Sequence, residues 1–174
     1  MTQPPQTHLA TLVVDCIPRL RRYARALMCG HEQAADDLVQ DTLERGLSRI
    51  SSWRANSSML AWLLTIMHNL YINQSRRLNT GPVFETLSEH IAEPAAPGTE
   101  SPLAKRELDR ALMQLSAEHR EIILLVGLED FSYQQVADIL DVPAGTVMSR
   151  LSRARTRLRQ ILNGEVQPTL RRVK

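Results

Sequence analysis

The sequence has little cysteine and no long apolar run. Among its 174 residues only Cys16 and Cys29 are cysteines, which are too few for a disulfide framework. The closest pairing of cysteine with histidine is Cys29 with His31, and two ligands do not make a closed metal site. The longest nearly apolar run, residues 59–67, has nine residues against the roughly 18 that a membrane span needs. We therefore expect no metal site and no membrane insertion.

The N-terminal residues also lack an export signal. No Lys or Arg precedes a hydrophobic stretch in MTQPPQTHL, and Asp15 interrupts the apolar residues that follow. Because nothing in the cysteine content points to an oxidising compartment either, we expect a cytoplasmic protein.

Motifs typical of enzymes are missing as well. No nucleophile motif, phosphate-binding glycine loop or metal signature accompanies the histidines, which are scattered along the chain. They are His8, His31, His68, His90 and His119. The sequence predicts that the protein is not an enzyme by itself and needs no cofactor.

The charges are nearly balanced but unevenly distributed. The chain has 21 Lys and Arg against 19 Asp and Glu. Residues 79–102 hold four acidic and no basic side chains, whereas residues 147–163 hold five Arg and no acid. The near-neutral average therefore hides an acidic connector and a basic stripe.

The acidic connector also divides the chain. It contains four prolines and two glycines, which prevent a long helix, while apolar residues on either side recur at helical spacings of three and four. We predict an all-α protein with two small helical domains, residues 9–78 and 103–163. A flexible linker at 79–102 joins them, and a tail follows at 164–174.

Three helices are expected in the first domain. The first can begin at Pro18 and ends at Gly30. The second spans residues 31–50 and turns an acidic and amide face away from the core, and the third spans residues 59–77 and has a second stripe beside its apolar one. The outward positions are Asp37, Gln40, Asp41 and Glu44 on the second helix, and Trp62, Ile66, Asn69, Asn73 and Arg76 on the third.

The second domain ends in a helix-turn-helix pattern. Ser116 can cap one helix and Ser132 a short one over residues 133–140, and residues 141–143 then form a turn before a helix that starts at Ala144. At about 100° per residue, one narrow sector of the last helix is apolar and must face the core. That sector consists of Val147, Leu151, Ala154 and Leu158.

The opposite side of this last helix is basic and rich in hydroxyls. Arg can fork onto guanine in the major groove of DNA, and Ser or Thr can reach bases or phosphates. The alternative is a solvated basic face on a packing helix. The outward sector holds Gly145, Ser149, Ser152, Arg153 and Thr156, flanked by Thr146, Arg150 and Arg157 on one side and by Arg155 and Arg159 on the other.

Three segments resemble one known family in the expected order. FSYQQVADILDVPAGTVMSRLSRARTRLR is similar to the promoter-reading helix-turn-helix of extracytoplasmic-function sigma factors. ADDLVQDTLERGL and AWLLTIMHNLYINQSRR resemble the core-binding and minus-10 segments of the same family. The resemblance covers residues 9–163. It implies a two-domain sigma factor of the shortest type that directs RNA polymerase to promoters and helps to melt the minus-10 region, in a stress response.

The resemblance also implies roles for individual residues. The segment that presses against the beta-prime clamp helices of core RNA polymerase matches Asp37, Leu38, Val39, Gln40 and Asp41. The part that captures an unpaired base of the minus-10 element matches Asn69, Asn73, Arg76 and Arg77, with the loop at residues 51–58. The positions that read the minus-35 element match Thr146, Ser149, Arg150, Arg153 and Arg157. Many members carry Asp where this chain has Asn73.

Some interpretations stay open from the sequence. Trp53 and Trp62 could stack on bases or complete the core, and we favour the core for Trp62. A sigma-like decoy that only occupies an anti-sigma factor is one alternative function, and a conventional helix-turn-helix regulator is another. The family habit further implies an anti-sigma factor as a partner, which could clamp the two domains together and hide both DNA-reading faces.

Overall fold

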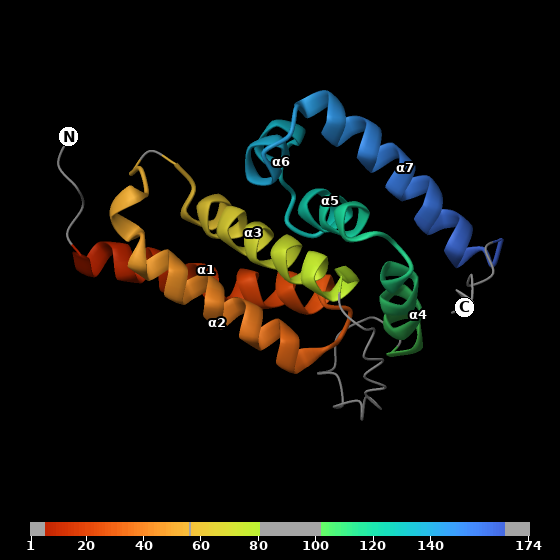
Figure 1. Cartoon of the computed structure of the whole chain (residues 1–174), viewed down its shortest axis with the longest axis horizontal. Helices are drawn as coiled ribbons and strands as arrows, with labels where there is room; N and C mark the ends of the chain where they lie inside the picture. Colours follow the sequence, from red (N-terminus) through yellow and green to blue (C-terminus); the bar gives the residue numbers. More distant parts are fainter. Residues whose placement is uncertain (1–5, 56, 81–101, 166–174) are drawn as a thin grey trace.

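The computed structural model describes residues 6–55, 57–80 and 102–165, and these residues are almost entirely helical (Figure 1). No β-strand occurs among them, which confirms the predicted all-α class. The elements are α1 (Gln6–Leu27), α2 (Glu32–Ser48), the short 3-10 helix η1 (Ile50–Ser52), α3 (Met59–Thr80), α4 (Pro102–Met113), α5 (Ala117–Gly127), α6 (Tyr133–Leu140) and α7 (Ala144–Leu162). Most of the predicted linker and of the predicted tail lies outside the described residues. None of the described helices combines the length and apolarity that a membrane crossing requires.

Helix α1 begins well before Pro18, so the expectation that Pro18 marks a helix start is wrong. A proline inside a helix cannot donate to the carbonyl four residues earlier, here that of Val14. Val14 and Pro18 are both exposed, so this carbonyl lies on the solvent side, where water can replace the missing donor. Leu9 and Val13 are buried, and their packing stabilises the helix ahead of the proline.

Helices α2 and α3 approach closely at Gly46. A Cβ added at this glycine would lie 2.7 Å from Cδ2 of Leu63, which is fully buried and therefore has little room to move. Trp62 and Ile66 lie within 4 Å of the same point. Gly46 is therefore the position that lets α2 and α3 pack side by side.

Both cysteines are buried free thiols in the first half of the chain. Burial raises the pKa of Cys16 on α1 and of Cys29 in the turn that follows α1. At Cys29, Arg120 from the second half of the chain opposes that increase, and Asp109 adds to it. Cys29 and Gly30 have φ values of +51° and +85°, and this left-handed turn ends α1 where the sequence predicted.

The second half follows the predicted capping and turn signals. The Ser116 hydroxyl accepts from the backbone N–H of His119, and Ser132 forms a full capping box with Gln135, which the sequence analysis missed. Asp141 adopts a left-handed conformation with φ of +52°, and Pro143 directly precedes α7. These local signals confirm the helix-turn-helix made by α6 and α7.

The two halves of the chain pack against each other. Helices α1, α2 and α3 contact one another. In the second half α7 contacts α4, α5 and α6, and α5 contacts α6; further contacts join α3 to α6 and α1 to α5. In Figure 1, α3 runs between the α1–α2 pair and the second half. The helix with the predicted minus-10 residues therefore also supports the first helix of the helix-turn-helix.

Candidate DNA and polymerase interface

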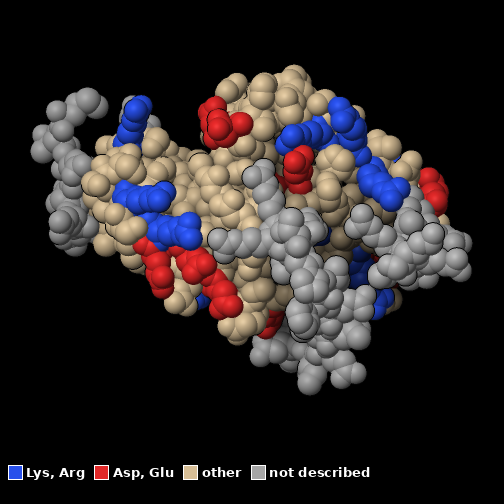
Figure 2. All heavy atoms as spheres, in the orientation of Figure 1, with Lys and Arg blue, Asp and Glu red and all other residues tan. Residues whose placement is uncertain are grey.

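Helix α7 presents one basic, hydroxyl-rich face to solvent. Val147, Leu151 and Ala154 are buried and Leu158 is half-buried, as the predicted sector requires. Ser149 and Arg153 on the other side are exposed, and a run of Lys and Arg side chains follows α7 in Figure 2. The rigid packing of one face leaves the other free to meet a ligand along its length.

The five predicted minus-35 residues are not equally accessible. Ser149 and Arg153 are exposed, and the Ser149 hydroxyl donates to the Thr146 carbonyl at 3.1 Å. Thr146 and Arg157 are half-buried. Ser149 and Arg153 are thus the members of this set with the most open approach for a base.

Arg150 has a partner within the protein. Its Nη1 lies 3.3 Å from Oε2 of Glu118 on α5, and the side chains are 29% and 58% exposed. An exposed pair of this kind is weak, so DNA could displace Glu118 at small cost. The pair nevertheless holds Arg150 toward α5 and away from the most open part of α7.

Next to the exposed face lies a shallow hollow of about 410 Å³ between α6 and α7. Tyr133 and Met148 line it, together with Ser152, Arg155 and Arg159. The last three are predicted on the outward side of α7, whereas the sequence pattern predicted no role for Tyr133 or Met148. The signal was present, because Met148 lies one turn before Ser152 on α7 and Tyr133 is the first residue of α6.

The predicted minus-10 stripe on α3 divides into two parts. Trp62 and Ile66 are half-buried beside Gly46 of α2, so this end of the stripe belongs to the packing of the first half. Asn69 and Asn73 are exposed one turn apart. Asn69 Nδ2 donates to the Thr65 carbonyl at 2.9 Å, which fixes the amide against its own helix.

Other predicted minus-10 features are described only in part. The side chains of Arg76 and Arg77 lie outside the described residues, although their backbone continues α3. In the loop before α3, Trp53 is buried, and Ser58 Oγ accepts from Ala61 N at 3.2 Å. Trp53 therefore packs in the core of the first half.

The predicted polymerase-binding segment on α2 has a buried and an exposed side. Leu38 and Val39 are each 4% exposed and pack in the core, so they position the helix. Asp37, Gln40 and Asp41 are exposed, and Asp37 accepts a hydrogen bond from Gln33 at 2.9 Å. The contact surface that α2 offers is therefore made of carboxylate and amide groups.

No cluster that could hold a metal ion occurs in the described part of the chain. Nowhere in residues 6–55, 57–80 and 102–165 do three His, Cys, Asp or Glu side chains come close enough together to coordinate an ion. The chemical character of the exposed faces is instead anionic and amide-rich on α2, amide-rich on α3, and cationic on α7.

Two family descriptions match the two halves of the chain. The family "Sigma2 domain of PhyR" matches residues 13–68, and "Sigma-70, region 4" matches residues 105–158. The first match includes α2 and the part of α3 up to residue 68, and the second includes α6 and most of α7.

Similar proteins of known type span nearly the same length. The ECF RNA polymerase sigma factor EcfG of Rhodopseudomonas palustris is 36% identical over 156 residues, which cover 86% of this chain and 82% of that protein. The ECF RNA polymerase sigma-E factor of Haemophilus influenzae is 30% identical over 77% of this chain and 75% of its own length.

Two solved structures have the same fold as this chain. The sigma factor RpoE of Bartonella quintana, solved in complex with the anti-sigma factor NepR, is 35% identical with a TM-score of 0.71 over 88% of this chain and 96% of that one. The anti-anti-sigma factor PhyR of the same organism shares the fold at 20% identity and a TM-score of 0.60, over 87% of this chain and 49% of that one. Because the chain has a helix-turn-helix and is at least 30% identical to these sigma factors over most of their length, it belongs to the extracytoplasmic-function sigma factors.

Proposed function

We propose that this protein is an alternative sigma factor that binds core RNA polymerase through α2 and promoter DNA through α3 and α7. The observation that carries the proposal is the geometry of α7. Its apolar side is locked into the second half, while Ser149 and Arg153 project from the opposite side directly after a capped turn. This is the arrangement in which the second helix of a helix-turn-helix enters the major groove.

For core polymerase, we propose contact by Asp37, Gln40 and Asp41. Their exposed carboxylates and amide can pair with basic groups on a partner helix, and such complementary charge sets orientation and association rate. Leu38 and Val39 contribute by fixing α2 in the core. The partner surface implied by the family is the pair of clamp helices of the beta-prime subunit.

For the minus-10 element, we propose that Asn69 and Asn73 meet an unpaired base, with Arg76 and Arg77 near the backbone. An amide offers both a donor and an acceptor, which suits the edge of a base taken out of its stack. The exposure of the two Asn side chains one turn apart supports this assignment.

For the minus-35 element, we propose base contacts by Ser149 and Arg153. We assign the contacts to flanking phosphates to Thr146, Arg150 and Arg157. Arg150 is already paired with Glu118, and the other two side chains are half-buried, so they have a less open approach to a base. RNA polymerase carries out the chemistry of transcription.

We also propose an anti-sigma factor as a partner. The related sigma factor RpoE of Bartonella quintana was solved in complex with the anti-sigma factor NepR, and it covers most of this chain at 35% identity. A protein inhibitor would restrict when the DNA-reading faces become available.

Run-off transcription with bacterial core polymerase tests the function. Purified protein and a library of promoter fragments are expected to give new transcripts with melting near minus 10. The double variant Asp37→Ala with Asp41→Ala is expected to lose core binding and transcripts together. The control Asp15→Ala removes an exposed carboxylate from α1 and should leave both intact.

The same assay separates a second candidate, the sigma-like decoy. The match to the sigma2 domain of PhyR favours this candidate, because PhyR is described as an anti-anti-sigma factor. A protein that captures an anti-sigma factor but neither binds core polymerase nor yields transcripts would be a decoy. Core binding with promoter-specific transcripts excludes that function.

A further inference from the structure

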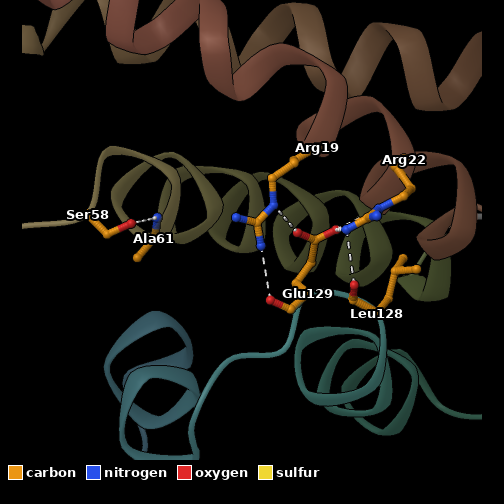
Figure 3. Close-up of polar contacts among 6 residues, drawn as sticks. All are labelled: Arg19, Arg22, Ser58, Ala61, Leu128 and Glu129. Atoms are coloured by element: carbon orange, nitrogen blue, oxygen red, sulfur yellow. Dashed lines mark hydrogen bonds and ion pairs between the residues drawn. The ribbon is translucent and has the colours of Figure 1, made fainter.

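One buried carboxylate joins the two halves of the chain. Glu129, in the turn between α5 and α6, has a fully buried side chain, and both of its oxygens point toward α1 (Figure 3). Arg19 Nε donates to Oε2 at 2.8 Å and Arg22 Nη2 to Oε1 at 2.9 Å. The same arginines also donate to the Glu129 and Leu128 carbonyls at 3.0 and 3.1 Å. We refer to Arg19, Arg22 and Glu129 as the Glu129 latch.

A second cation spans the same boundary. Arg120 on α5 donates from Nη1 to the Leu27 carbonyl at the end of α1 at 3.0 Å and to the Tyr71 hydroxyl of α3 at 3.3 Å. Its other nitrogens donate to carbonyls at the end of α4, including that of Leu112 at 2.9 Å. One guanidinium therefore satisfies free carbonyls at the ends of two helices from different halves.

A third polar contact lies nearby. His68 Nδ1 on α3 is 2.9 Å from Oε1 of Glu121 on α5, and Glu121 is 1% exposed. The other oxygen, Oε2, is buried without a hydrogen-bond partner among the described residues. The second half therefore brings two buried carboxylates, Glu129 and Glu121, against the first half.

Such a boundary is suited to opening. Buried ion pairs have a high desolvation cost, so their net contribution is small while they remain intact. Arg19 and Arg22 are 47% and 53% exposed, so water and salt can reach the cationic side of the latch. Interfaces between domains of one chain that move are typically polar in this way.

The packed arrangement conflicts with simultaneous contact to two promoter elements. Elements at minus 35 and minus 10 lie about 25 base pairs apart, or roughly 85 Å along the duplex at about 3.4 Å per base pair. A compact chain of this length has a radius of gyration of about 16 Å. Helix α6 rests on α3 in the packed form, so the two DNA-reading helices cannot separate across that span.

We propose that the Glu129 latch closes the free protein, and that it must break before α3 and α7 can occupy both promoter elements. The inference about promoters rests on the proposed function, whereas the closure itself is a property of the chain alone. The α1 surface around Arg19 and Arg22 therefore binds the second half of the same molecule.

The decisive variant is Arg19→Ala with Arg22→Ala. Both arginines are half-exposed, so their loss creates no cavity, but it leaves the Glu129 carboxylate buried without its cations. An unpaired buried charge is strongly unfavourable, and separation of the halves returns it to water. The matched control is Arg21→Ala with Arg25→Ala, which removes two exposed arginines of the same helix outside the latch.

Small-angle scattering of the free full-length proteins gives the first readout, with circular dichroism to verify helix content. The latch variant should show a radius of gyration clearly above the about 16 Å of a compact chain, with its helices retained. Wild type and control should stay compact. A latch variant that stays as compact as wild type overturns the proposal. Glu129→Gln provides a second route if the double variant unfolds. It removes the charge that pairs with both arginines, so expansion in the same direction is expected, and it is smaller because no unpaired charge stays buried.

Binding to core polymerase and promoter gives the second readout. If nine free molecules in ten are closed, removing the closed state tightens apparent binding about tenfold. Unchanged affinity in an expanded variant would overturn the link between the latch and promoter engagement. Failure of every protein, wild type included, to bind core or promoter would overturn the proposed function instead, and the scattering result would still decide the closure.

Discussion

Individual side chains determine which parts of α7 can read DNA. Arg153 is exposed, while Arg150 is held by Glu118 and Arg157 is half-buried. A guanidinium that reaches a guanine makes a bidentate contact, and one that reaches phosphate does not distinguish sequences. The exposure of each arginine therefore separates the two kinds of contact.

Replacement Arg153→Ala is expected to weaken binding to the minus-35 element by about 1–3 kcal/mol and to relax specificity at one base pair. Equilibrium binding to a promoter and to a set of single-base variants measures both effects. Arg106→Ala, an exposed arginine on α4, is the control and should leave affinity unchanged. Uniform weakening on every sequence would assign Arg153 to phosphate.

The buried Glu121 carboxyl makes the folded protein sensitive to pH. Burial raises its pKa above the ordinary value of 4.5, and the hydrogen bond and charge of His68 oppose the increase. Glu118 raises the pKa further and Arg120 lowers it. Because the folded state binds this proton more tightly than the unfolded state, the contribution of Glu121 is favourable below its ordinary pKa. That contribution is lost as pH rises through the raised pKa.

Glu121→Gln removes this titration and keeps an oxygen that can accept from His68. The variant is therefore expected to lose less stability than wild type as pH rises from the ordinary carboxyl pKa of 4.5 through the raised pKa of Glu121. Thermal unfolding across that range measures the difference. Glu107→Gln, on the exposed side of α4, should follow wild type, and a Glu121→Gln curve parallel to wild type would contradict the assignment.

Helices differ in how much of their geometry comes from nearby sequence. The caps at Ser116 and Ser132, the turn at Asp141 and the buried side of α7 depend on residues within one or two turns, so the sequence predicted them. The helix start predicted at Pro18 was wrong, because the packing of apolar residues ahead of the proline outweighs its local preference for the first turn of a helix. The full capping box at Ser132 is local as well, because Gln135 follows Ser132 at the three-residue spacing typical of this motif.

The close contact of α2 with α3 gives a prediction for Gly46→Ala. The added methyl would meet the buried Leu63 side chain at 2.7 Å, and overpacking of this kind costs about 1–3 kcal/mol. Denaturant unfolding measures the loss. Gly127→Ala at the end of α5, where nothing lies within 4 Å, is the control and should be neutral. Equal stability of the two variants would contradict a tight contact at Gly46.

The arrangement of the two halves is the part that the sequence could not predict. Glu129 lies 110 residues from Arg19, and in the sequence it is one acid in a loop beside another, Asp130. Its burial depends on the approach of α1, which no local pattern encodes. The burial of Leu38 and Val39 is different, because the helical spacing of apolar residues already predicts it, and only the family resemblance groups them with the contact residues.

Because of this arrangement, the labelling rates of the two native thiols should report two different motions. Cys29 is 4% exposed and lies near Arg120 and Asp109 of the second half, whereas the charged groups around Cys16, Asp15 and Arg19, belong to α1. Alkylation of Cys29 should therefore proceed at the rate at which the halves part, and that of Cys16 at the slower rate at which α1 unfolds. Mass spectrometry of each labelled cysteine over time measures both rates. Equal labelling rates in wild type would mean that the halves never separate without unfolding. Unequal rates would give the lifetime of the closed molecule from its native cysteines alone.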